Sequence, residues 1–217
     1  MLFRSEEVRV EPAKRTHGGK QRSPKQKSAS AKKMALEWWL KTDSLNMLFG
    51  DAPFTPDRYL LSFDKQLLSQ VGQIKKSLGR KARMIAWALP PLILEGDLPK
   101  YRKQIRLLLR SGFRSFQIGH ISQVMLFGGE KVHLFADYST NLLNSQAFAL
   151  MAEMGVEAAQ ALVEADREAL IDLLAGCRKA DRPMPGENRE RRIPVGLTVY
   201  GTPALYTSRL AAKHFQY

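Results

Sequence analysis

The sequence predicts an α/β protein: an incomplete barrel of parallel strands that alternate with helices, preceded by a basic segment without regular structure. After residue 35, short apolar runs of strand length alternate with amphipathic stretches of helical period. Residues 12–33 instead contain eight Lys and Arg, no acid and no apolar periodicity, which is typical of disorder. We therefore divide the chain into a disordered basic tail or linker at 1–34 and a β/α domain at 35–217.

Composition narrows the class of protein. A chain of 217 residues with 44% hydrophobic and 25% charged residues can bury one substantial core, as soluble globular proteins do. No apolar run reaches the ~18 residues of a membrane-spanning helix, and the first residues lack the apolar core of a secretory signal. Cys177 is the only cysteine, so this chain forms no internal disulfide. We expect a cytoplasmic protein with no membrane contact.

The net charge of +13 suggests a nucleic-acid partner, and eight of the positive charges lie in the tail. Such a tail could bind the phosphates of RNA through counterion release. A solvated linker between domains is the preferred interpretation, because the tail has no interleaved aromatic residues to stack on bases.

Six strands are expected from the apolar runs, at residues 58–63, 83–89, 113–119, 131–137, 157–164 and 193–200. Apolar residues recur at helical spacing between them, and Gly79, Gly112 and Gly155 stand where three helices would end. Asp97 and Asp166 are expected to cap the helices that follow them.

Residues 182–192 form a polar loop before the last strand, and Trp38 and Trp39, just after the tail, are expected to anchor the core.

Alternating strands and helices imply a parallel sheet, either open or closed as a barrel. The Gly-x-Gly-x-x-Gly fingerprint of an open dinucleotide-binding sheet is absent from the sequence, whereas polar residues follow four of the strands. The barrel is preferred, with two of its eight strands missing.

Four segments of the chain match a known family in order and spacing. They are "WALPPLI" at 87–93, "DYSTNLLNS" at 137–145, Glu164 in "ALVEADREAL", and "LTVYGTPALYTSRL" at 197–210. Together they resemble the collagenase-like peptidase family U-32 over residues 85–209. The second segment is the most specific, with Thr140 where the family usually has leucine.

The resemblance implies a barrel-like β/α fold and an enzyme, or a factor for RNA modification by hydroxylation. Many relatives hold an iron–sulfur cluster through four cysteines that begin after a Ser-Arg pair. Here Ser208 and Arg209 are followed by Leu210, so no cofactor is expected in this chain. The resemblance also implies a piece of a longer protein, whose missing strands belong to the remainder or to a partner chain.

Polar residues at successive strand ends are expected to converge at the barrel mouth around a small polar ligand or a nucleotide base. The candidate binding residues are Asp137, Asn141, Asn144, Glu164, Tyr200 and His120.

Each candidate also has a structural interpretation. Asp137 could accept backbone N–H groups, Asn144 could cap a helix, and Asn141 could be a turn residue. Glu164 ends a run that looks buried and could pair with an arginine such as Arg209.

His120 and Tyr200 also have structural interpretations. His120 could transfer protons or be an ordinary loop histidine. Tyr200, with Tyr206, could line the mouth or simply pack.

The sequence leaves three functions open. The first is a U-32-like enzyme or RNA-modification factor, the second a non-catalytic binding or scaffold protein, and the third a true peptidase. The zinc, nucleophile-elbow and phosphate-loop motifs are absent from the sequence, and no catalytic residue can be named. Cys177, at a helix end near Arg178, gives no indication of a catalytic dyad.

Overall fold

The computed structural model describes residues 36–50, 54–179 and 193–201. The predicted disorder of the tail and the predicted loop at 182–192 lie outside the described residues, as do Tyr206 and the Ser208–Arg209 pair.

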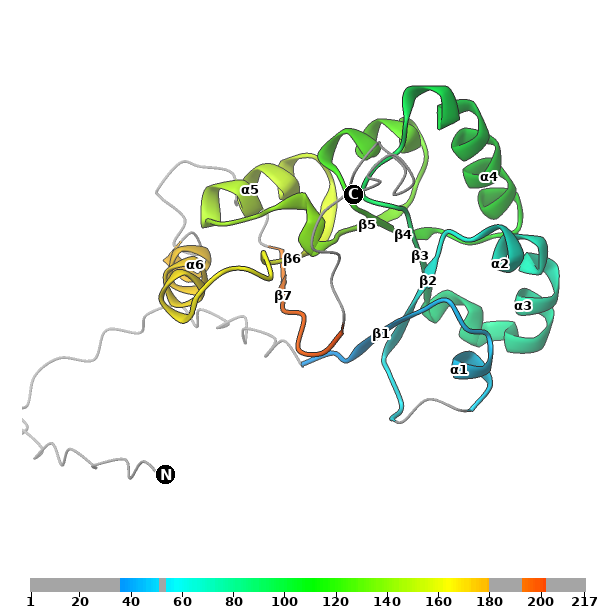
Figure 1. The fold of residues 1–217 in the computed structure, drawn as a ribbon, viewed down its shortest axis with the longest axis horizontal. Helices are drawn as coiled ribbons and strands as arrows, with labels where there is room; N and C mark the ends of the chain where they lie inside the picture. Colours follow the sequence, from blue (N-terminus) through cyan, green and yellow to red (C-terminus); the bar gives the residue numbers. More distant parts are fainter. Residues whose placement is uncertain (1–35, 51–53, 180–192, 202–217) are drawn as a thin grey trace, which may run out of the picture. The chain divides into compact units, whose positions relative to one another are not determined.

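Seven strands form one sheet over the described residues, and every neighbouring pair is parallel. They are β1 (Trp39–Thr42), β2 (Arg58–Ser62), β3 (Ile85–Ala88), β4 (Ser115–Ile118), β5 (His133–Ala136), β6 (Val156–Gln160) and β7 (Val195–Gly196). Their order in the sheet is their order in the chain, whereas a doubly wound sheet reverses its order. The sheet curls into a half-barrel, which is TIM-barrel-like and confirms the predicted fold class (Figure 1).

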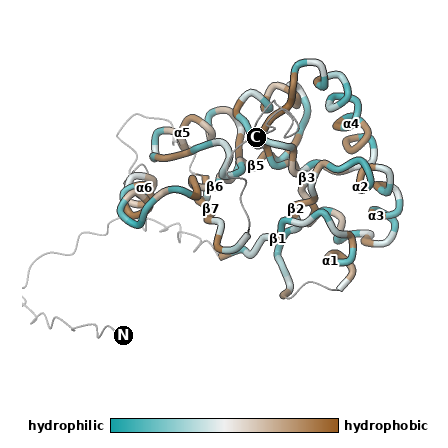
Figure 2. Tube along the Cα trace, in the orientation of Figure 1, coloured by the Kyte–Doolittle hydropathy of each residue, from teal (hydrophilic) through white to brown (hydrophobic). Residues whose placement is uncertain are grey.

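Helices connect the strands and lie outside the curl of the sheet (Figure 1). The α-helices are α1 (Asn46–Phe49), α2 (Lys65–Ser69), α3 (Val71–Leu78), α4 (Leu98–Arg110), α5 (Ser145–Glu153) and α6 (Arg167–Lys179). The 3-10 helices are η1 (Gly79–Met84), η2 (Glu95–Asp97), η3 (Ile121–Phe127) and η4 (Tyr138–Thr140). In Figure 2, α4 alternates between brown and teal, as expected of an amphipathic helix with one buried face.

The main core lies between the convex face of the sheet and the helices. Trp87 and Phe116 of the sheet are fully buried there against Ile74 of α3 and Leu108 of α4. Side chains alternate between the faces of a strand, so the residues between these point to the concave face. A second, smaller apolar cluster forms there around Leu60, Ala86 and Phe135, with Trp39 and Ala158 packed against it.

The expected number of six strands is wrong, because β1 is a seventh. Its sequence, "WLKT", has a lysine where a longer apolar run would have signalled a strand. Trp38 does not anchor the core, since 49% of it is exposed and it contacts Phe54 at the surface. Trp39 is partly buried and packs on the concave face instead.

Element boundaries also differ from the sequence expectation. β6 ends at Gln160 rather than at Glu164. The last backbone hydrogen bond between this segment and β7 is made by the N–H of Ala161, which donates to the carbonyl of Gly196. β7 likewise ends at Gly196. The helical stretch after β2 is divided at Gln70 into α2 and α3.

Candidate functional site

Four polar side chains from separate strands lie on the concave face toward the carboxyl ends of the strands. They are Lys41 of β1, Gln117 of β4, Asp137 directly after β5, and Gln160 of β6, and we call them the concave polar layer. The register supports this placement, because Lys41 pairs with Leu60 and Gln117 pairs with Phe135. Both partners belong to the apolar cluster of the concave face.

Asp137 is the most constrained member of the layer. It is 4% exposed, and its backbone N–H donates to the carbonyl of Ile118 at 2.8 Å, which continues the β4–β5 pairing past the end of β5. Its Oδ2 accepts a hydrogen bond from Lys41 Nζ at 3.0 Å, an ion pair that joins β1 to β5 across the concave face. Its Oδ1 is buried and has no hydrogen-bond partner among the described residues.

Gln117 and Gln160 continue the layer beside Asp137. Gln117 Nε2 donates to Gln160 Oε1 at 3.3 Å, and the backbone N–H of Tyr138 donates to the same oxygen at 3.3 Å. Gln117 is 1% exposed, and with its amide nitrogen engaged its Oε1 is left buried without a partner in the described part of the chain.

Below the layer, toward the amino ends of the strands, the concave face is filled. The guanidinium of Arg58 lies 5.0 Å from the centre of the Trp39 ring and 4.8 Å from that of Phe135, distances at which a cation is attracted to both rings. Trp39 and Phe135 also contact each other edge to face, with 4.9 Å between ring centres. These three side chains pack together on the concave face beneath the layer.

The layer therefore offers two unused acceptors and one exposed cation. A buried acceptor without a partner costs about 1–3 kcal/mol, which a ligand that donates to it recovers. The carboxylate Oδ1 of Asp137 and the amide Oε1 of Gln117 are suited to N–H or O–H donors. The side chain of Lys41 is 42% exposed, so its ammonium group can also donate to an acceptor on the same ligand.

The sequence-predicted residues occupy different positions around this layer. Only Asp137 belongs to it. His120 is exposed, and its Nδ1 accepts from the N–H of Ser122 at 3.2 Å, at the start of η3. Asn144 caps α5, since its Oδ1 accepts from the N–H of Ala147 at 2.9 Å. Asn141 is exposed and has the left-handed φ of 58° that suits a turn residue.

Glu164 and Tyr200 lie at exposed positions. The expected burial of Glu164 is wrong, because the chain leaves the sheet at Gln160 and Glu164 falls in an exposed turn. Tyr200 follows β7 and is 96% exposed. No hydrogen bond within the described ranges joins any two of the six candidates.

Sequence reasoning missed Lys41, Gln117 and Gln160. Each is a polar residue inside a short strand, in "WLKT", "SFQI" and "VEAAQ". The available signal was the alternation itself, because a glutamine flanked by two buried apolar residues faces the opposite side of the sheet.

The described ranges contain neither a cluster of metal ligands nor a membrane-spanning helix. Among these residues, His, Cys, Asp and Glu side chains do not gather in groups of three that could hold a metal ion. No helix of the described part has the length and apolar character needed to cross a membrane.

Comparisons with known proteins extend to the fold alone. No family model matches the chain, and no curated protein matches it. Among solved structures it is similar to MenC from Desulfotalea psychrophila LSv54, with a TM-score of 0.45 and 10% identity over 75% of this chain. The chain spans 46% of that protein. It is also similar to the U32 peptidase Mk0906, with a TM-score of 0.45 and 10% identity, covering 78% of this chain and 95% of the other.

Proposed function

We propose that the concave polar layer binds a polar ligand that donates two hydrogen bonds, and that the protein is a U-32-like enzyme or RNA-modification factor acting at this mouth. One observation carries the proposal: Asp137 Oδ1 and Gln117 Oε1 are buried acceptors without partners, on or directly after neighbouring strands. Native proteins rarely leave such groups unpaired, and exceptions often mark functional sites.

A nucleotide base suits the layer because it presents N–H donors and ring acceptors on one edge. The donors would meet Asp137 and Gln117, and Lys41 would donate to a ring or carbonyl acceptor. The net charge of +13 supports a nucleic-acid substrate over a collagen-like peptide. Contact with RNA through the basic tail and a cytoplasmic location are parts of the same proposal.

A true peptidase is less well supported. Peptide hydrolysis by a serine requires a hydroxyl that is activated by a neighbouring base. Ser139 is close to Asp137, with 3.5 Å between Oγ and Oδ2, but its hydroxyl lies 2.9 Å from the carbonyl of Gly119 and donates there. A second candidate function is binding without catalysis, which the Lys41–Asp137 ion pair favours because each charge is already engaged by the other.

The test is a thermal-shift titration of the full chain with two sets of probes, the four ribonucleosides and short Gly-Pro peptide amides. A ligand at 100 times its Kd stabilises the folded state by ~2.7 kcal/mol, which is readily measured. We expect at least one nucleoside to raise Tm and the peptide amides to leave it unchanged.

Gln117→Met and Gln104→Met provide the matched pair of variants. Both remove a glutamine Oε1 that is buried without a partner, but Gln104 lies on α4 and away from the layer. Loss of the nucleoside shift in Gln117→Met alone supports the proposal. An equal shift in wild type and Gln117→Met, or no shift with any nucleoside, overturns it, and a shift with the peptide amides alone favours the peptidase.

A further inference from the structure

Charge is unevenly distributed over the folded part of the chain. Residues 75–114 contain eleven Lys and Arg but only two acids, Glu95 and Asp97. Residues 115–178 reverse this balance, with three Lys and Arg against eight acids. The positive charge of the protein is therefore not confined to its tail.

The basic residues of this stretch are all exposed, and they come from adjacent elements. We define the basic face by its two rows, Lys76, Arg80 and Arg83 on α3 and η1, and Lys103, Arg106 and Arg110 on α4. The two elements meet where Lys75 Nζ donates to the carbonyl of Ser111, just past the end of α4.

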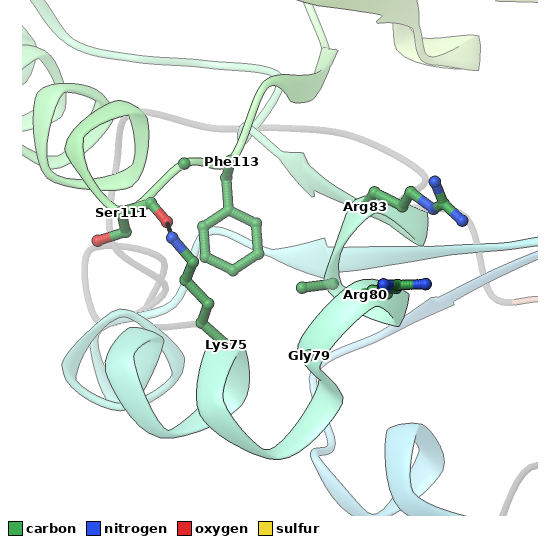
Figure 3. Close-up of a pocket in the computed structure, with 8 residues that line it drawn as sticks. Lys75, Gly79, Arg80, Arg83, Ser111 and Phe113 are labelled. Atoms are coloured by element: carbon green, nitrogen blue, oxygen red, sulfur yellow. Dashed lines mark hydrogen bonds between the residues drawn. The ribbon is translucent and has the colours of Figure 1, made fainter.

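A surface hollow of about 190 Å³ lies at this junction, lined by residues of α3 and η1 and by Ser111–Phe113. Figure 3 shows Lys75 reaching toward Ser111, while the guanidinium groups of Arg80 and Arg83 extend away from the ring of Phe113. Three of the eight lining residues are basic and none is acidic.

These charges are not balanced within the described residues. Neither ion pair found there includes a residue of the basic face, so its positive charges repel one another without compensation. Such repulsion lowers the stability of the free protein, and it is relieved when a polyanion binds.

We propose that the basic face binds the phosphodiester backbone of a nucleic-acid duplex. Six of the eleven basic residues in 75–114 are arginines, whose planar fork matches the oxygens of a phosphate. The 13 residues of α4 span about 20 Å, a length over which one strand of a duplex presents about six phosphates.

The aromatic residues of the same stretch favour a duplex over a single strand. Trp87 and Phe113 are buried, and Tyr101 is partly buried and stacked on Phe63, so none offers a free ring for an unpaired base. A bilayer is disfavoured as the partner, because Leu107 is the one exposed large apolar side chain on α4.

This inference does not rest on the concave polar layer. The basic face belongs to the helices outside the sheet, whereas the layer belongs to the concave side. The two proposals therefore fail separately, because the nucleoside titration tests the concave polar layer, whereas the duplex affinity of charge-reversal variants on α4 tests the basic face.

The experiment measures binding of the full chain to a labelled 20-base-pair duplex of random sequence, as RNA and as DNA, by fluorescence anisotropy across salt concentrations. The test variant is Lys103→Glu/Arg106→Glu/Arg110→Glu. The control is Lys131→Glu/Arg167→Glu/Arg178→Glu, which changes the net charge equally at exposed cations outside the basic face. Circular dichroism verifies that both variants fold.

We expect the test variant to weaken duplex binding at least tenfold and to reduce the slope of log K against log salt by about 3, one for each phosphate contact removed. The control is expected to change affinity less than threefold. A preference for RNA or for DNA supports the proposal equally, because both present the same backbone chemistry.

Three outcomes overturn the proposal. If both triple variants weaken binding equally, the effect is one of net charge or of the tail. If single strands of equal length bind as tightly as duplexes, the backbone of a duplex is not the ligand. If phosphatidylserine vesicles bind wild type and lose affinity with the test variant while duplexes do not, the face is a membrane-binding surface.

Discussion

Among single residues, Gly119 has a crowded position directly after β4. Its N–H donates to Gln123 Oε1 at 2.9 Å, and its carbonyl accepts from the Ser139 hydroxyl. Gln123 in turn donates from Nε2 to the carbonyl of Pro90 at 2.7 Å. Gly119 therefore connects the segments that follow β3, β4 and β5, next to the concave polar layer.

We predict that Gly119→Ala destabilises the protein by about 1–3 kcal/mol, as overpacking of a filled site does. The added Cβ would lie 2.6 Å from Pro91 Cα and 2.9 Å from Pro91 N, and neither backbone atom can move aside easily. The control is Gly72→Ala on α3, where a Cβ meets nothing within 4 Å. That change should be neutral or stabilise by up to about 1 kcal/mol in urea unfolding, because alanine favours helix. Equal effects of the two changes would contradict the packing argument.

Tyr101 gives the protein a pH dependence at alkaline pH. Burial against Phe63 raises the pKa of the Tyr101 phenol above its ordinary value of 10.0, and the carboxylate of Asp97 raises it further. Because its pKa is raised in the folded protein, the neutral Tyr101 phenol contributes to the free energy of unfolding. This contribution is complete below about pH 10 and is lost as the pH rises through the folded-state pKa.

Tyr101→Phe should therefore show a smaller loss of Tm than wild type between pH 9 and 11, because phenylalanine cannot ionise. Near pH 7 the difference between the two proteins should be independent of pH. The measurement is Tm by circular dichroism across this range, and parallel curves for the two proteins would rule out the effect.

Among the elements, the helix ends show where local sequence rules hold. Asn144 caps α5, and Asp166 Oδ1 accepts from the N–H of Ala169 at 2.7 Å at the start of α6, which confirms the predicted cap. Asp97 occupies the predicted N-cap position of α4, but its side chain does not cap the helix. Asp97 is the last residue of η2 and already has helical backbone angles, and its side chain makes no cap hydrogen bond.

Asn144→Ala should consequently lower the free energy of unfolding by about 1 kcal/mol, the usual value of a lost N-cap. Asp97→Ala is the matched control, and it should cost clearly less because it breaks no cap bond. Both values come from chemical denaturation at neutral pH. A larger loss for Asp97→Ala would contradict the cap geometry described for α4 and α5.

For the whole molecule, the segregation of charge predicts how salt affects stability. Raising NaCl from about 0.1 M to about 1 M shortens the Debye length from about 10 Å to about 3 Å and screens repulsion within the basic face. We expect Tm to rise by a few degrees, since about 1 kcal/mol corresponds to about 2–4 °C in a protein of this size.

The triple variant Lys103→Glu/Arg106→Glu/Arg110→Glu should gain less from salt than wild type, because part of the repulsion is already removed. Differential scanning calorimetry at the two salt concentrations measures both values. A Tm that falls with salt in wild type would show that attraction, rather than repulsion, dominates the surface.

Alternation of apolar and polar residues by itself determined that strands and helices follow one another along this chain, and it placed six of the seven strands found in the described residues. It also indicated polar residues at the strand ends, among them Asp137. These features can be predicted from the sequence because burial of one face of a helix or strand places apolar residues at regular spacing along a continuous stretch.

Only the tertiary structure decided which polar residues meet. Lys41 and Asp137 are 96 residues apart, and Gln117 is 43 residues from Gln160. Their contacts arise because a parallel sheet that curls brings the carboxyl ends of separate strands together, and no local pattern records that curvature. The burial of Asp137 and the exposure of Glu164 and Tyr200 follow from the same curvature and from where β6 and β7 end.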